Sequence, residues 1–126
     1  MKSIKNLGIK TKEGFEVKNL KRFPSMEWGE EGGLEAEVYL DGKLAGTIFD
    51  AGDGGEPNFT YADSALTRQA IAAKGLAFLK RTDPDYGDHS KYSHLFAGKT
   101  VENFDNSDYQ AIVNVIEERH EMVKQA

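Results

Sequence analysis

The chain has 126 residues, a net charge of −5, 39% hydrophobic residues and 29% charged residues. This composition suits one globular domain over residues 1–126 and excludes a disordered tail. The chain contains no cysteine, so disulfides, thiolate metal sites and cysteine nucleophiles are excluded. No apolar run approaches the roughly 18 residues of a membrane span, and we expect a cytoplasmic protein.

Charge is distributed unevenly along the chain. Residues 1–22 hold seven basic and two acidic residues (net +5), residues 23–63 one and ten (net −9), and residues 64–126 eight and nine (net −1). The basic segment permits only weak, salt-sensitive binding to nucleic acid. The acidic middle repels phosphate and attracts a basic partner. The alternative is a solvated sheet surface that a basic first strand balances.

The first strands are predicted from short alternating patterns. Residues 1–14 are polar and rich in lysine, and we predict a basic arm or a short strand there. Residues 15–23 begin with alternating apolar and charged side chains, which is typical of a strand. The alternation fails after Asn19, and we expect Pro24 to end or bend this strand.

A β-hairpin is the strongest local signal. Residues 34–40 read LEAEVYL, with alternate side chains apolar, and residues 43–50 read KLAGTIFD. Asp41 and Gly42 between them form the pair favoured in a two-residue type I′ turn, because both tolerate positive φ. On the return strand, strict alternation places Leu44 with Ile48 on one face and Ala45 with Phe49 on the other.

Two helices are predicted in the second half of the chain. The first begins at Asp63 or Ser64 and ends near Arg81. Its broad apolar stripe consists of Leu66, Ala70, Ala73 and Ala77, together with Ile71, Leu76, Phe78 and Leu79. The second begins at a capping box over residues 107–110. Its apolar stripe includes Tyr109, Ile112, Val113, Ile116, His120 and Val123, and we expect Glu117, Glu118 and Glu121 to face solvent. The fold class is therefore α+β, with a small three-stranded antiparallel sheet around the Asp-Gly hairpin, covered by two C-terminal helices.

The loop FDAGDGGEPN, residues 49–58, raises the question of a ligand site. Asp50, Asp53 and Glu56 are residue types that bind Ca²⁺ or Mg²⁺. Their spacing does not match an EF-hand, and the glycines form neither a dinucleotide-binding fingerprint nor a P-loop. We interpret the loop as the exit of the hairpin, with a charge that favours a basic partner.

A second polar segment, DPDYGDHSKYSH at residues 83–94, holds metal-binding residue types. Asp85, Asp88, His89 and His94 suit Zn²⁺ or Mn²⁺, or acid–base chemistry. The two histidines lack the helical spacing of H-E-x-x-H, so a polar connection is the alternative. A small metal-dependent enzyme, or a metal-stabilised module, is the second function that we consider. We predict no catalytic residues and no cofactor. His120 is predicted to be a core or boundary residue.

The segment SMEWGEEGG, residues 25–33, contains the single tryptophan of the chain among acidic residues and glycines. Tryptophan is enriched in binding hot spots, whereas a tryptophan packed across the sheet would be a core anchor. We predict a partner-binding site that consists of Trp28, Glu30, Glu31, Asp50 and Asp53.

Residues 23–55 resemble a pattern found in small proteins of bacteriophages and mobile elements. The pattern is an aromatic residue, a short polar loop, a strand, the turn Asp41-Gly42-Lys43, a second strand and a loop rich in Asp and Gly. The resemblance implies a non-enzymatic protein that binds and blocks a host defence protein, such as a CRISPR nuclease, in an anti-CRISPR-like manner. The partner would present a basic surface, with no direct contact to nucleic acid or membrane.

Overall fold

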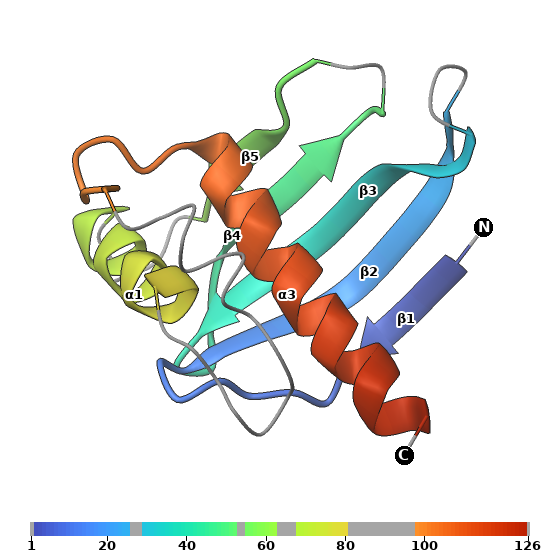
Figure 1. The fold of residues 1–126 in the computed structure, drawn as a ribbon, viewed down its shortest axis with the longest axis horizontal. Coiled ribbons are helices and arrows are strands. Elements are labelled where there is room, and N and C mark those ends of the chain that lie inside the picture. Colours follow the sequence, from blue (N-terminus) through green and yellow to red (C-terminus); the bar gives the residue numbers. More distant parts are fainter. Residues whose placement is uncertain (1, 26–28, 53–54, 63–67, 81–97, 126) are drawn as a thin grey trace.

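The computed structural model describes residues 2–25, 29–52, 55–62, 68–80 and 98–125. Five strands form one antiparallel sheet in the order β1-β2-β3-β4-β5. The strands are β1 (Lys2–Asn6), β2 (Phe15–Ser25), β3 (Gly29–Leu40), β4 (Lys43–Asp50) and β5 (Asn58–Tyr61). Two helices follow within the described residues, α1 (Arg68–Lys80) and α3 (Asn106–Gln125). Figure 1 shows α3 lying across one face of the sheet.

The α+β class, the antiparallel sheet and the two C-terminal helices are confirmed. The predicted number of three strands is wrong, because the sheet has five. Short β1 and β5 strands add one edge each, and both are too short to show a clear alternating pattern. The predicted basic segment at residues 1–14 contains β1, which pairs with β2. No helix of the described chain is long and apolar enough to span a membrane.

The β3–β4 hairpin is confirmed, with one shift of register. Asp41 and Gly42 both have positive φ, as a type I′ turn requires. A bulge at Ala45 of β4 shifts the register between Val38 and Tyr39, so that Leu44 lies opposite Tyr39 and Ala45 is fully buried. The predicted faces of Leu44 and Ala45 are therefore wrong, because the extra residue at the bulge interrupts the period of two.

Strand β2 is longer than predicted and includes Pro24. Asn19 has a φ of 53° at a bulge between Lys18 and Lys21, which explains why the alternation fails there. β1 pairs with β2 only as far as Arg22. The nitrogen of Pro24 faces the side of β2 that β1 would occupy, so the missing N–H removes no sheet hydrogen bond and the strand continues.

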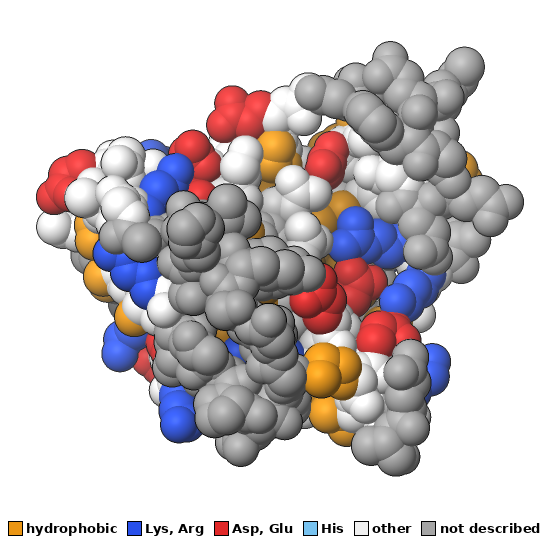
Figure 2. Space-filling model, viewed as in Figure 1, with side chains coloured by type: hydrophobic (Ala, Val, Ile, Leu, Met, Phe, Trp, Pro, Cys, Tyr) orange, Lys and Arg blue, Asp and Glu red, His pale blue; other side chains and the backbone are white. Residues whose placement is uncertain are grey.

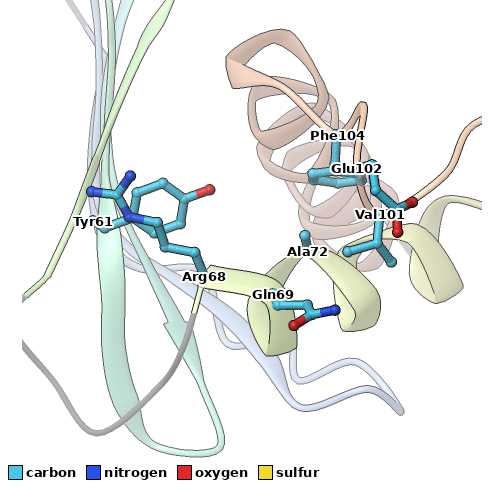
Figure 3. A pocket seen from close by; sticks show the side chains of 7 residues that line it. All are labelled: Tyr61, Arg68, Gln69, Ala72, Val101, Glu102 and Phe104. Atoms are coloured by element: carbon cyan, nitrogen blue, oxygen red, sulfur yellow. The ribbon is translucent and has the colours of Figure 1, made fainter.

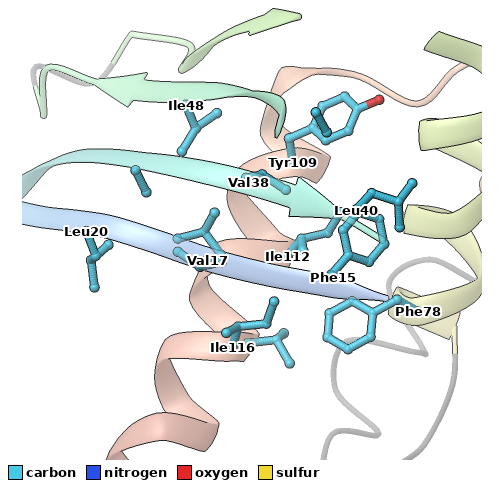
Figure 4. Packing of buried hydrophobic residues seen from close by; sticks show 14 of the residues in the cluster. Phe15, Val17, Leu20, Val38, Leu40, Ile48, Phe78, Tyr109, Ile112 and Ile116 are labelled. Atoms are coloured by element: carbon cyan, nitrogen blue, oxygen red, sulfur yellow. The ribbon is translucent and has the colours of Figure 1, made fainter. Parts of the chain in front are cut away.

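The core lies between the sheet and the two helices. Apolar side chains of β2, β3 and β4 meet the buried face of α3 and the end of α1 (Figure 4). The buried residues of α1 are Ile71, Ala72, Gly75, Phe78 and Leu79. The alanines at 70, 73 and 77 are exposed instead, because the larger side chains at 71, 78 and 79 define the apolar face.

The N-cap of α3 lies two residues before the predicted one, Ser107. Asp105 is the N-cap: its Oδ1 accepts from the amide of Asp108 at 3.2 Å, and Asp108 Oδ2 accepts from the amide of Asp105 at 2.8 Å. This exchange is the reciprocal arrangement of a capping box, with aspartate in place of the expected glutamate or glutamine. Tyr109, Ile112, Val113 and Ile116 are buried as predicted, whereas Val123 is exposed.

Candidate partner-binding surface

The sheet topology brings two acidic segments of the chain to one end of the sheet. In an antiparallel meander, the ends of β2 and β4 and the starts of β3 and β5 lie at the same end of the sheet, as Figure 1 shows. Residues 25–33 and 50–56, which belong to these ends and starts and to the segments after them, contain six acidic residues and no basic residue. We call residues 25–33 and 50–56 the acidic end. The predicted site residues all belong to it by sequence position.

An aromatic pair lies beside the acidic end, on the face of the sheet opposite α3. The rings of Phe23 and Phe49 are stacked, with centroids 5.9 Å apart and an angle of 24° between their planes. Phe23 lies opposite Gly33 in the register, and a Cβ on Gly33 would overlap the Phe23 ring. Gly33 therefore gives the ring a flat backbone to lie on. Phe49 is 44% exposed and is the only exposed aromatic residue of the described chain.

Elsewhere on this open face, polar and charged side chains of β2 and β3 contact one another. The Nζ atom of Lys18 lies 4.7 Å from the centroid of the Tyr39 ring, and Asn19 Nδ2 donates to Glu37 Oε1 at 2.6 Å. Burial, with the neighbouring Glu37 carboxylate, raises the pKa of Tyr39. Among the described residues of the open face, Phe49 is the exposed large apolar side chain.

The predicted partner-binding residues differ in what the structure shows of them. Asp50 is half-buried, and both of its oxygens accept hydrogen bonds within the chain: Oδ1 from the amide of Gly52 at 2.9 Å, and Oδ2 from Gln110 Nε2 at 2.7 Å. Its carboxylate holds the end of β4 against α3. Glu30 and Glu31 belong to β3. Trp28 and Asp53 lie outside the described residues.

The candidate metal ligands Asp85, Asp88, His89 and His94 also lie outside the described residues. Within the part of the chain that the structure describes, no three histidine or acidic side chains are placed to hold a metal ion. His120 is half-buried, and its Nδ1 lies 2.8 Å from the carbonyl oxygen of Leu7. A carbonyl only accepts, so Nδ1 donates, and this bond ties α3 to the segment after β1.

A cluster of ion pairs between α3 and the first two strands corrects another expectation. Glu117 Oε1 accepts from Nη2 of Arg22 at 2.5 Å, and Lys2 Nζ contacts Glu117 at 3.2 Å and Glu121 at 2.6 Å. The Glu117 side chain is only 12% exposed, so it does not face solvent as predicted. Burial alone would raise the pKa of Glu117, but the hydrogen bonds and charges of Arg22 and Lys2 outweigh it and lower that pKa. These ion pairs connect α3 to β1 and β2.

A cavity of about 240 Å³ lies between the start of α1 and the segment before α3 (Figure 3). The Arg68 guanidinium lies 4.6 Å from the centroid of the Tyr61 ring, and the Tyr61 and Tyr109 hydroxyls are 2.9 Å apart. Burial and this hydrogen bond raise the pKa of Tyr109, so the Tyr109 phenol stays neutral. The residues that line the cavity are Tyr61, Arg68, Gln69, Ala72, Val101, Glu102 and Phe104. The site combines one cation, one carboxylate and aromatic walls, without an activated nucleophile among its described residues.

Over the residues that the structure describes, the helical side of the molecule carries side chains of both charges. In Figure 2, acidic and basic side chains are interspersed over the part of this face that is described.

Comparisons of the chain with protein-family models, with curated proteins and with solved structures found no match.

The sequence pattern does not predict the aromatic pair. Phe23 and Phe49 are distant in sequence, and the bulge in β2 shifts Phe23 out of the simple alternation. The available signal was Gly33, a glycine inside a strand that alternates well from residue 34 onward. Glycine at such a position often marks close approach of another group.

Proposed function

We propose that this chain is a non-enzymatic binding protein that docks its acidic end and aromatic pair on a basic surface of a protein partner. The observation that supports this most directly is the exposed Phe49, stacked on Phe23 at the border of an end with six acidic residues. In protein interfaces, a few aromatic hot-spot residues often provide most of the binding energy. Charges of one sign around them favour association with a surface of the opposite sign. The proposed class of partner is a nucleic-acid-handling protein, such as a defence nuclease, whose basic groove the acidic end would occupy in place of phosphates.

The test is capture of partners from a bacterial lysate with the purified chain, followed by competition. The captured protein should leave the chain when a short DNA duplex or high salt is added, because both compete for the same basic groove. Two binding variants are compared with wild type: Trp28→Ala with Glu30→Lys and Glu31→Lys, and Phe49→Ser alone. Each should weaken binding by about 10- to 100-fold, the range for loss of a hot spot or of complementary charge.

A matched control reverses the same number of charges elsewhere. Glu16→Lys with Glu102→Lys changes the net charge as much as the double reversal in the first variant, but acts on residues outside the acidic end. Control and wild type should bind alike, and all variants should keep the wild-type circular dichroism spectrum. If the control loses as much affinity as the acidic-end variant, or if the captured partner ignores the duplex, the proposed docking surface is wrong.

A further inference from the structure

The cavity beside Tyr61 is built from residues that the proposed docking surface does not use. Its volume is about 240 Å³. Figure 3 shows Tyr61 and Arg68 on one side of it and Val101, Glu102 and Phe104 on the other, with α1 between the two sides. None of the residues that line it belongs to the acidic end or to the aromatic pair. A function of this cavity would therefore add to the proposed docking function.

One buried tyrosine holds both aromatic walls of the cavity in place. The Tyr61 hydroxyl lies 2.9 Å from the Tyr109 hydroxyl, and the Phe104 ring meets the Tyr109 ring nearly edge-on, with centroids 5.0 Å apart. Tyr109 is only 1% exposed and is itself stacked on Phe59. The amide of Phe104 donates to the carbonyl oxygen of Val101 at 3.3 Å, in a turn that brings both residues to the cavity. These contacts are made within the chain, so the walls are formed before any ligand binds.

Arg68 supplies a positive charge to the lining of the cavity. Its side chain is exposed, and its guanidinium lies over the Tyr61 ring, 4.6 Å from the ring centroid. None of the ion pairs between described residues involves Arg68. Glu102 also lines the cavity, but Figure 3 shows it on the opposite side. The N–H donors of a guanidinium lie in its plane, so contact of its face with a ring leaves them available for a carboxylate.

The size and the lining of the cavity limit the class of ligand. An apolar cavity of about 150 Å³ holds a benzene ring, whereas pockets for drug-sized ligands start at about 300 Å³. At about 240 Å³, this cavity suits one aromatic ring with a short side group. Tyr61 and Phe104 offer such a ring the aromatic contacts that it favours. A phosphate ester would bring two negative charges to a lining with one cation and one carboxylate, so a single carboxylate is the better match.

We propose that this cavity binds a small aromatic monocarboxylate, whose ring lies between Tyr61 and Phe104 and whose carboxylate accepts hydrogen bonds from Arg68. The buried Ala72 of α1 contributes only a methyl group to the lining, which leaves room for the ring. This inference goes beyond the proposed function, because it assigns the chain a small-molecule site that needs neither the acidic end nor the aromatic pair. Either proposal can therefore fail without the other.

Three probes that share one ring test the selectivity for a negative charge. Phenylacetate is negative, phenylacetamide is neutral and phenethylamine is positive. Each is titrated into the isotope-labelled chain, and the backbone amide signals are followed by NMR. Phenylacetate should shift the signals of the lining residues saturably and bind about tenfold more tightly than phenylacetamide, because its hydrogen bonds with a guanidinium are charge-assisted. Equal binding of these two probes, tighter binding of phenethylamine, or no saturable shift with phenylacetate would each overturn the proposal.

Three variants of the chain complete the test. Arg68→Gln should weaken phenylacetate about tenfold and leave phenylacetamide nearly unchanged. Lys74→Gln removes one positive charge from an exposed position of the same helix and should bind phenylacetate as wild type does. Ala72→Leu fills the cavity from α1 and should abolish the binding of both probes. If Ala72→Leu does not keep the wild-type circular dichroism spectrum, the comparison of the other two variants still decides. An equal loss of affinity in Arg68→Gln and Lys74→Gln would mean attraction by net charge alone and would overturn the site.

Discussion

Substitution of Gly46 by alanine tests whether β5 can pack closely against β4 only because Gly46 has no side chain. Gly46 lies in the middle of β4, opposite Tyr61. A Cβ at this position would lie 2.6 Å from the carbonyl oxygen of Thr60 and 2.5 Å from Cζ of Phe59. Neither neighbour can move easily, since the Thr60 oxygen belongs to the backbone of β5 and the Phe59 ring is stacked on Tyr109 with centroids 3.9 Å apart.

The magnitude follows from two opposing effects. Overpacking of a well-packed site costs about 1–3 kcal/mol. Replacement of a glycine inside a strand by alanine returns about 0.5–1 kcal/mol, because the unfolded chain loses freedom. The free energy of unfolding of Gly46→Ala should therefore fall by about 1–2 kcal/mol, and the melting temperature by about 3–8 °C.

Urea unfolding followed by circular dichroism measures this difference, with Gly98→Ala as the control. A Cβ on Gly98 would have no atom within 4 Å, so this substitution should be neutral or slightly stabilising. If Gly46→Ala is as stable as the control, β5 can shift at no cost, and the close approach does not hold Phe59 and Tyr61 in place. In that event the close approach would not fix the position of Tyr61 in the wall of the cavity either.

Three further predictions concern single hydrogen-bonded groups. The lowered pKa of Glu117 gives a stabilisation that is complete above about pH 4.5 and is lost as the pH falls through the folded-state value; the difference in unfolding free energy between wild type and Glu117→Gln should therefore shrink in acid, and a difference independent of pH would contradict this. Asp105→Ala removes the N-cap of α3 and should lower the free energy of unfolding, measured in urea, by about 1 kcal/mol. An unchanged free energy of unfolding would mean that another group accepts the hydrogen bond from the Asp108 amide. Tyr61→Phe leaves the buried Tyr109 hydroxyl without its Tyr61 partner and should cost about 1–3 kcal/mol by thermal melting, more than Tyr109→Phe, because the half-buried Tyr61 can reach water; the reverse order would refute the reasoning.

The sequence predicts those parts of the fold that depend on neighbouring residues. The turn at Asp41 and Gly42 is encoded by two residues that tolerate positive φ, and the hairpin around it is confirmed. The buried face of α3 follows from helical spacing. These features involve contacts within a few residues, where side-chain period and backbone preference decide the outcome.

The features that the sequence does not predict depend on bulges and on distant partners. The bulge at Ala45 reverses the facing of two residues, although nothing in KLAGTIFD distinguishes it from a regular strand. Glu117 reads as a solvent-exposed helix residue, because its partner Arg22 is 95 residues away. The aromatic pair also depends on distant residues, since Phe23 and Phe49 meet only after β3 has paired with β2 and with β4. One local feature also differs from its prediction: the N-cap of α3 lies two residues earlier, because aspartate takes the place of the usual glutamate in its capping box.

The ion pairs of Lys2 have a consequence for the order of folding. Every sheet neighbour is also a neighbour in sequence, so the sheet can grow by hairpins with short loop closures. The contacts of Lys2 with Glu117 and Glu121 join residues 115 and 119 positions apart, and such closures are entropically late. Variants at Lys2 should therefore accelerate unfolding while leaving the refolding rate nearly unchanged. The lifetime of the native state would then depend on a contact that the folding nucleus does not contain.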